Sequence, residues 1–350
     1  MSTLADRAHV SPSESRCQEQ HSPPALQSER KLVLEQPSKY PVLTLPTEII
    51  IEVFMHFLPT YPLCPPLTGL DSPTLLTQIC HEWREIALGT ATLWRAISLN
   101  DHTIPFEHQA HLCNMWLSRS LCHPLSIDIY EDIVNPLRTA ELLSALVLHR
   151  ARWQHLNLHR LSISLLRMIE PGPTPLLRSL NLFLTDYELD LVTTTNVVFR
   201  EAHLLRTVVL NDYAAEYLAL PWAQLTALTL RGVFPRECVP VLQHASNLVH
   251  CELNLVNESV DTPDISLPSL QSLTLTGRSV TGYLETLIAP ALLELEIPES
   301  FLGPNSIDTL TSFMSKSRCK LRALCITQYA SVSRDLFYKA FPLIAVCFEE

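Results

Sequence analysis

The chain has 350 residues, of which 47% are hydrophobic and 17% are charged, and its formal net charge is −11. This composition supports a globular core of one or two domains. The negative charge offers no positive field for phosphate backbones or anionic lipids, so neither nucleic acid nor a membrane is an expected partner. Residues 1–10 lack the apolar core of a secretory signal, and no run approaches the roughly 18 apolar residues of a spanning helix.

Ten cysteines are present, and no two of them have the Cys-x-x-Cys spacing. Cys80, Cys251 and Cys325 fall within apolar periodicity, where a reduced thiol behaves as a small hydrophobic side chain. This usage favours a reducing compartment. We therefore expect the protein to be cytoplasmic or nuclear.

Residues 1–39 are rich in Ser, Gln, Glu, Pro and Arg. Such a segment cannot bury enough apolar surface to offset the entropy lost on ordering. We expect a flexible amino-terminal tail, followed by the first ordered domain from about residue 40.

A helix is predicted from Leu45 to about Leu58. Pro46 suits the first helical turn, and Glu48 lies near the positive end of the helix dipole. The apolar positions that follow make a broad face on such a helix. They are Ile49, Ile50, Val53, Phe54, Phe57 and Leu58. Pro59 and Pro62 then end the helix.

A second helix is predicted from Ser72, which can cap it, to Gly89, which can end it. Its apolar stripe consists of Leu75, Leu76, Ile79, Cys80, Trp83, Ile86 and Ala87. Leu93 and Trp94 supply a third apolar element. A unit of roughly 55 residues cannot bury all of these side chains within itself. The surplus is expected to face either the rest of this chain or another protein.

The residues Leu-Pro-x-Glu-Ile at 45–49, Ile-Cys-x-x-Trp-x-x-Ile-Ala at 79–87 and Leu-Trp at 93–94 resemble the F-box, over roughly residues 43–97. The chain departs from that family through the proline-containing insertion at 60–70, where many F-boxes have a tight turn. The resemblance implies binding to the Skp adaptor of a cullin-type ubiquitin ligase. The adaptor-facing positions that it implies are Leu45, Pro46, Ile49, Phe54, Leu75, Leu76, Cys80, Trp83 and Trp94. Trp83 is also compatible with the module's own core.

One group of potential metal ligands follows this region. It consists of His108, His111, Cys113, Cys122 and His123. Their spacing matches no closed zinc pattern, and histidines scattered on a helix surface explain it equally well. We therefore predict no metal site and no cofactor.

The pattern Leu-x-x-Leu-x-Leu, with conservative replacements, then occurs eight times at intervals of 20 to 29 residues. The matches begin at Trp153, Leu177, Leu205, Leu225, Leu248, Leu270, Leu292 and Leu321. The pattern resembles leucine-rich repeats, in which a short strand buries alternate residues and the chain returns one layer higher. The predicted fold class is α/β: a small helical F-box at 40–100, then an irregular leucine-rich-repeat solenoid with a curved parallel sheet at 101–350.

Further elements are predicted within the solenoid. Residues 124–130 alternate like a strand and are expected to form its first layer. Residues 139–148 and 306–313 are expected to be helices on its far side. The Asn or Cys that normally follows the last leucine is absent from all eight repeats. The turns must therefore satisfy their backbone groups in another way.

Residues between the repeat leucines are predicted to lie on the opposite, exposed face of the sheet, because successive strand side chains alternate. We expect a client protein to bind this face. The candidate residues are His155, Phe183, Asn211, Arg231, Glu252 and Glu294, with Phe183 and Arg231 as anchors. A merely solvated sheet face is the alternative.

No residue set points to catalysis. The sequence has no Gly-rich phosphate loop, no Gly-x-Ser-x-Gly elbow and no His-Glu-x-x-His helix. The carboxylate pairs Asp186 with Asp190 and Glu294 with Glu296 are more simply solvated strand or loop residues. We predict no catalytic residue and no enzymatic activity.

The leading hypothesis is a substrate-recognition subunit of a Skp-cullin-F-box ubiquitin ligase. Its expected partners are the Skp adaptor, a cullin reached through that adaptor, and an unidentified client protein. The first alternative is an F-box scaffold that binds the adaptor without ubiquitin delivery. A second is a hydrolase that uses the His/Cys group.

Overall fold

The computed structural model describes residues 45–100, 104–131, 136–169, 172–185, 197–199, 201–256, 262–278, 280–328 and 333–349. All of them belong to one compact unit that begins at Leu45. The predicted tail at 1–39 lies outside the described residues, as does the pair Asp186 and Asp190.

The described chain begins with a small group of helices, here called the helical module (residues 45–94). It contains α1 (Thr47–Phe57), α2 (Pro73–Ile79), α3 (His81–Gly89) and the short 3-10 helix η2 (Ala91–Trp94). Pro46 immediately precedes α1, and Ser72 caps α2 by accepting a hydrogen bond from the Thr74 backbone N–H.

The single second helix predicted from Ser72 to Gly89 is wrong, because the chain is extended at Cys80. The backbone there has φ −154° and ψ 171°, which separates α2 from α3. The Cys80 Sγ accepts a hydrogen bond from the Trp83 backbone N–H at 3.4 Å and thereby caps α3. A thiol that looked like one more apolar position therefore begins a new helix.

The repeats form one parallel sheet, which in the described residues has eleven strands in the order β1-β2-β3-β4-β6-β8-β9-β11-β13-β14-β15. Eight of these strands match the eight predicted repeats: β3 (Trp153–Leu161), β4 (Ser179–Leu184), β6 (Thr207–Asn211), β8 (Ala227–Val233), β9 (His250–Leu255), β11 (Ser272–Gly277), β13 (Glu294–Pro298) and β14 (Ala323–Thr327). The fold class, α/β with a leucine-rich-repeat type of solenoid and a large parallel sheet, is confirmed.

The pairing register explains why the repeat leucines form a continuous core. Leu180 lies between Leu156 and Val208 on the neighbouring strands, and all three side chains are fully buried. Each layer therefore buries its apolar residues against the layers beside it.

Strand β2 (Leu125–Tyr130) confirms the strand predicted at 124–130, but it is the second layer, because β1 lies at the edge of the sheet. Two strands were missed. Strand β1 (Ala96–Leu99) pairs with β2 and falls inside the range 40–100 that was predicted as F-box, and β15 (Ala345–Phe348) pairs with β14. Both are four residues long and lack the Leu-x-x-Leu-x-Leu pattern. Two short pairs, β5 (Val197–Val198) with β7 (Leu218–Ala219) and β10 (Ile265–Ser266) with β12 (Leu287–Ile288), lie apart from the main sheet.

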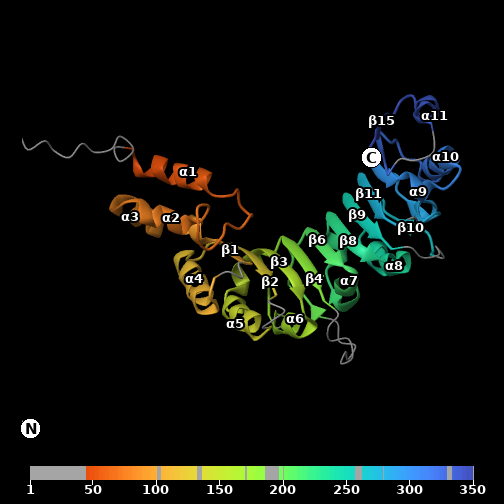
Figure 1. Cartoon of the computed structure of the whole chain (residues 1–350). Coiled ribbons are helices and arrows are strands. Elements are labelled where there is room, and N and C mark those ends of the chain that lie inside the picture. The colour runs from red at the N-terminus through yellow and green to blue at the C-terminus, as the bar shows by residue number, and fades with distance from the viewer. Residues whose placement is uncertain are drawn as a thin grey trace, which may run out of the picture. The chain divides into compact units, whose positions relative to one another are not determined.

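Helices cover one face of the sheet, and the other face is left open, as Figure 1 shows. The covering helices are α4 (Phe106–Arg119), α5 (Pro136–Val147), α6 (Ile163–Ile169), α7 (Asp212–Tyr217), α8 (Pro235–His244), α9 (Glu299–Leu302), α10 (Ser306–Ser317) and α11 (Arg334–Ala340). Helices α5 and α10 confirm the predictions at 139–148 and 306–313. Three-residue 3-10 turns, η3 (Arg150–Arg152), η5 (Trp222–Gln224) and η6 (Leu284–Thr286), complete some of the layers.

Backbone groups make hydrogen bonds in the turns, where the missing Asn or Cys side chains of the repeats would otherwise bond to the backbone. The N–H groups of Thr185, Val256 and Arg278 donate to carbonyl oxygens of the preceding layer at 3.0, 3.0 and 3.1 Å. These are three of the positions where the expected Asn or Cys is missing. Beside the last of them, Gly277 has φ 109°, and a Cβ there would clash with the backbone of Leu255. The turn therefore depends on glycine at this position.

Candidate partner-binding surfaces

Helix α1 carries two apolar stripes that face different environments. Ile50 and Phe54 are buried, and the Phe54 ring meets the Trp83 ring edge to face at 4.9 Å. Ile49, Val53 and Phe57 follow the same four-residue spacing one position away, yet 48%, 46% and 39% of their surfaces are exposed. We call these three residues the outward stripe. The helix is thus apolar on more of its circumference than the module can cover.

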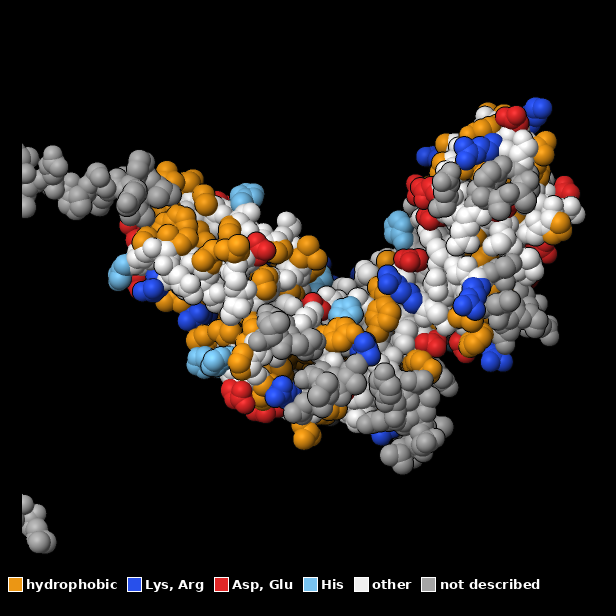
Figure 2. Space-filling model, viewed as in Figure 1, with side chains coloured by type: hydrophobic (Ala, Val, Ile, Leu, Met, Phe, Trp, Pro, Cys, Tyr) orange, Lys and Arg blue, Asp and Glu red, His pale blue; other side chains and the backbone are white. Residues whose placement is uncertain are grey.

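Other exposed apolar side chains occur in the helical module. Leu45 and Ile79 are 39% and 54% exposed, and Leu63 and Leu70 of the insertion are exposed further still. Figure 2 shows hydrophobic side chains gathered over this end of the molecule. An apolar patch of this kind on a soluble protein commonly marks a contact with another protein.

The structure divides the nine predicted adaptor-facing residues into three groups. Leu45, Pro46 and Ile49 are exposed, and Leu75, Cys80 and Trp83 are half-buried. The prediction is corrected for the remaining three, Phe54, Leu76 and Trp94, because at most 3% of each side chain is exposed.

Trp94 illustrates the reason for this correction. Its indole N–H donates to the Ala87 carbonyl at 2.9 Å, and its ring packs against Trp116 of α4. It therefore joins the helical module to the solenoid. Val53, Phe57 and Ile79 are surface residues that the prediction missed. For Val53 and Phe57 the doubled apolar positions in α1 were the signal, because they require two apolar stripes.

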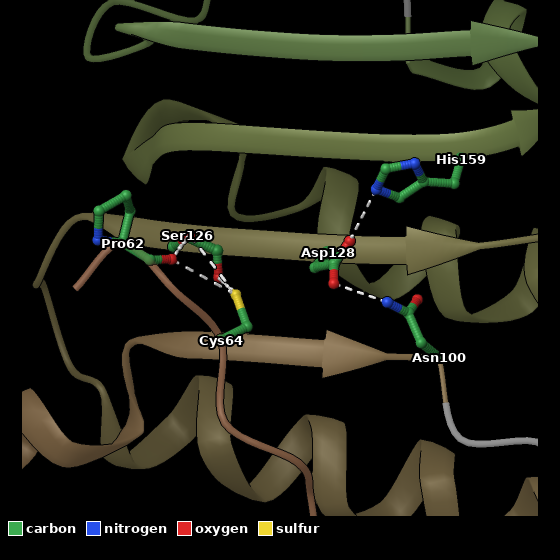
Figure 3. A network of polar contacts seen from close by, with 6 residues as sticks. All are labelled: Pro62, Cys64, Asn100, Ser126, Asp128 and His159. Atoms are coloured by element: carbon green, nitrogen blue, oxygen red, sulfur yellow. Dashed lines mark hydrogen bonds and ion pairs between the residues drawn. The ribbon is translucent and has the colours of Figure 1, made fainter. Parts of the chain in front are cut away.

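The insertion at 60–70 packs on the first strands of the sheet. The Tyr61 hydroxyl donates to Gln154 Oε1 at 2.9 Å, and the Ser126 hydroxyl donates to the Pro62 carbonyl at 2.6 Å. The Cys64 thiol donates to Ser126 Oγ at 3.5 Å, as Figure 3 shows. Leu67 is fully buried. The segment that departs from the F-box pattern thus connects the module to β2 and β3.

Burial changes the acidity of two groups in the insertion. It raises the pKa of Tyr61 to about 12, against a smaller lowering effect from the nearby Arg95. It also raises the pKa of the Cys64 thiol to about 12, with the Ser126 hydrogen bond acting in the opposite direction. Both groups are therefore neutral donors at physiological pH.

The predicted client-binding residues all occupy strand positions on the open face of the sheet, but their side chains make different contacts. Arg231 and Glu294 are exposed, whereas His155, Phe183 and Glu252 are half-buried. His155 lies against the Tyr61 ring at 5.4 Å, and Glu252 accepts a hydrogen bond from Thr229 at 3.3 Å.

Asn211 is a correction, because its amide is engaged by the fold. Its Oδ1 accepts from the backbone N–H groups of Leu184 and Ala214, and its Nδ2 donates to the Leu184 carbonyl at 2.9 Å. It therefore ties β4 to β6 and caps α7. Its side chain is not available to a client in this arrangement.

Three rings from neighbouring strands form a row on the open face. Tyr130 of β2 stacks on His159 of β3 with centroids 6.3 Å apart, and His159 stacks on Phe183 of β4 at 6.0 Å. The guanidinium carbon of Arg231 lies 5.7 Å from the centroid of Phe183. We call Tyr130, His159 and Phe183 the aromatic row. The sequence prediction named Phe183 and Arg231 but missed the partnership with Tyr130.

Neither a metal site nor a membrane span is found in the part of the chain that the structure describes. No group of three or more His, Cys, Asp or Glu side chains there could hold a metal ion. His108 and His111 are exposed on α4 while Cys113 is buried, so these side chains do not converge. None of the described helices is long and apolar enough to cross a bilayer.

A cavity of about 510 Å³ lies on the helix-covered side. Its lining includes Trp222, Glu237 and His244. Glu237 Oε2 accepts from the Phe234 backbone N–H at 3.0 Å, and His244 Nδ1 lies 2.7 Å from the Pro240 carbonyl oxygen. Both polar groups are thus bound to helix α8, and they do not form a catalytic pair.

No protein-family model matches the chain, and no curated protein matches it. Among solved structures, a chain in the crystal structure of the Rad7 and Elc1 complex in yeast is similar, with a TM-score of 0.36 and 13% sequence identity. The likeness covers 68% of this chain and 70% of that chain. A likeness at this level carries no argument about function, which is inferred from the surfaces of the chain itself.

Proposed function

We propose that this protein is a substrate-recognition subunit of a Skp-cullin-F-box ubiquitin ligase. The outward stripe of α1 is the observation that supports this proposal most strongly. Its three apolar side chains lie in the segment that resembles the F-box, and between 39% and 48% of their surface is left uncovered by the described chain. Removing such side chains from water contributes roughly 25 cal/mol for each Å² of apolar surface, before the entropy cost of association is subtracted.

The open face of the sheet supports the second half of the proposal. It offers outward polar and aromatic side chains on successive strands, among them His159, Phe183 and Arg231. A receptor of this kind supplies position instead of chemistry, because it holds the client near an enzyme bound elsewhere in the assembly. In this proposal the chain is not an enzyme, needs no cofactor, and acts in the cytoplasm or the nucleus.

Co-purification with the Skp adaptor tests the first half. We expect Ile49→Asp together with Val53→Asp to abolish recovery of the adaptor, because two carboxylates would have to be buried in an apolar interface. Leu148→Asp is the matched control, since this leucine is 84% exposed and lies outside the helical module. Thermal melts should show that all variants remain folded.

The same experiment separates the two F-box hypotheses. Recovery of a cullin together with the adaptor supports a ligase subunit, and adaptor without cullin supports a scaffold. Unchanged adaptor recovery in the folded double variant would contradict both.

A further inference from the structure

We infer that the aromatic row and Arg231 together bind an extended segment of a partner protein that carries one acidic side chain, with Arg231 holding its carboxylate or phosphate group. This inference rests on the proposed function and specifies the client that the open face would accept. It is carried by the ring contacts across three strands, the position of the guanidinium at their end, and the charge pattern of the face.

The orientation of the rings makes the row complementary to an anion. The interplanar angles are 23° between Tyr130 and His159 and 25° between His159 and Phe183, so the rings are stacked in near-parallel planes along the sheet. Side chains of a strand stand roughly perpendicular to the sheet. The ring faces are therefore used within the row, and the ring edges point away from the sheet. Ring edges carry the positive end of the aromatic quadrupole.

Arg231 extends this positive surface. It is exposed, and the structure gives it no hydrogen bond or ion pair to any described side chain. Its guanidinium is held over Phe183, within the distance at which a cation and a ring attract. A planar guanidinium fixed in this way presents paired N–H groups that match a carboxylate or phosphate.

The neighbouring side chain of β6 leaves space between Phe183 and Arg231. Asn211 pairs with Arg231 in the sheet register, but its amide is folded against the backbone of β4 and α7. No tall side chain therefore separates the ring from the guanidinium.

Contacts from below and beside the row hold it in one arrangement. Arg160 donates to the Tyr130 hydroxyl at 2.9 Å from a position where β3 bulges and φ is 56°. Asp128 Oδ1 lies 3.3 Å from His159 Nε2, and its Oδ2 accepts from Asn100 at 2.6 Å, as Figure 3 shows. A surface fixed before binding loses less conformational entropy when a partner docks.

The length of the surface predicts the length of the bound segment. From β2 to β8 the chain crosses four strand spacings, which is roughly 19 Å at 4.7 to 4.9 Å each. An extended peptide covers that distance with about six residues. The expected ligand has an acidic side chain at Arg231 and apolar or aromatic side chains along the row.

A single-stranded nucleic acid also combines negative charge with rings that stack, so the choice of a protein needs a reason. The inner faces of these rings are already stacked on one another, and the Arg231 guanidinium lies over Phe183, which limits the stacking of bases on the row. Asp128 and Glu252 flank the row on the same face, and the chain has a net charge of −11. A phosphate at every nucleotide would be repelled by these charges, whereas one acidic side chain reaches Arg231 alone.

Selection of a random eight-residue peptide library on the full chain tests the inference. We expect selected peptides to be enriched several-fold in acidic residues at one position and in aromatic or apolar residues at adjacent ones. Arg231→Gln should remove the acidic preference, and Phe183→Ala should weaken the aromatic preference. Arg178→Gln is the matched control, because Arg178 is exposed and precedes β4 at its opposite end.

The best peptide is then compared by fluorescence anisotropy in forms that carry Glu, Gln or phosphoserine at the acidic position. We expect the Gln form to bind at least ten times more weakly, and the Glu and phosphoserine forms to show which anion is preferred. The inference is overturned if wild-type selection shows no acidic preference or if Arg231→Gln preserves it. It is also overturned if a twelve-residue oligothymidylate competes better than the peptide. Adaptor recovery, measured on the same variants, reports on the proposed function separately.

Discussion

The repeat sheet and helix α1 contain similar apolar side chains, but they bury them to different extents. In the sheet, Leu180, Leu228 and Leu273 have at most 1% of their surface exposed. In α1, Ile49 and Val53 remain about half exposed. A repeat leucine has a layer on each side, whereas a module of three short helices has too little neighbouring surface to cover two stripes. Uncovered apolar surface in α1 therefore points to a partner.

The largest expected effect compares the same kind of substitution in both regions. Leu273→Asp places an unpaired carboxylate in the sheet core and should lower the free energy of unfolding by about 4 kcal/mol or more. Val53→Asp should change it by less than about 1 kcal/mol, because the side chain is 46% exposed. Denaturant unfolding followed by circular dichroism measures both values. Equal losses would show that the outward stripe is buried in the isolated protein.

A second comparison is made inside α1 itself. Phe54→Ala removes a buried ring that contacts Trp83 and should lower the free energy of unfolding by about 3 kcal/mol. Phe57→Ala, at 39% exposure, should cost about 1 kcal/mol or less. If the two alanine variants unfolded at the same denaturant concentration, the division of α1 into an inner and an outer stripe would be wrong.

The sequence predicted the sheet well because its signal is repeated and local. Each strand buries alternate residues, so the pattern Leu-x-x-Leu-x-Leu predicts both where a strand lies and which of its faces is buried. The missed strands β1 and β15 lack that signal, and they are in the sheet because β2 and β14 offer them unpaired edges. Their pairing is decided by neighbours in space and not by their own periodicity.

The candidate surfaces were only partly predictable. Leu45 and Ile49 were named and are exposed, but periodicity alone could not show that Trp94 would be covered by Trp116, which lies 22 positions further along the chain. Asn211 was misjudged because its hydrogen bonds cross from β6 to β4 and α7. The aromatic row depends on the pairing register of β2, β3 and β4, which cannot be predicted from a single sequence.

The contact between the two regions provides a smaller effect. Ser126→Ala removes the hydroxyl that donates to the Pro62 carbonyl and accepts from the Cys64 thiol. Because a partly buried carbonyl then loses its closer donor and keeps only the Cys64 thiol at 3.7 Å, the free energy of unfolding should fall by about 1 kcal/mol. Ser144→Ala is a suitable control, since its hydroxyl makes one exposed bond within α5. A loss no larger than that of the control would show that the insertion does not stabilise the junction.

The smallest expected effect compares the burial of two thiols, one at the junction with the helical module and one in the repeats. Cys113 lies on α4, which packs against η2 of the helical module, and Cys238 lies on α8 in the repeats. Burial raises the pKa of each thiol from 9.0 to about 12.

Between pH 9 and pH 12 the folded state therefore keeps the thiol protons that the unfolded state releases. The stability that each thiol contributes is fully present below pH 9 and is lost as the pH rises toward 12. By pH 10 the loss should be about 1 kcal/mol for each thiol. Denaturant unfolding at pH 8 and pH 10 should show a smaller decline in Cys113→Ala and in Cys238→Ala than in the wild type, by similar amounts. If only Cys238→Ala showed a smaller fall in the free energy of unfolding than the wild type, water would reach the core near the helical module. If neither variant showed a smaller fall, the burial of both thiols would be contradicted.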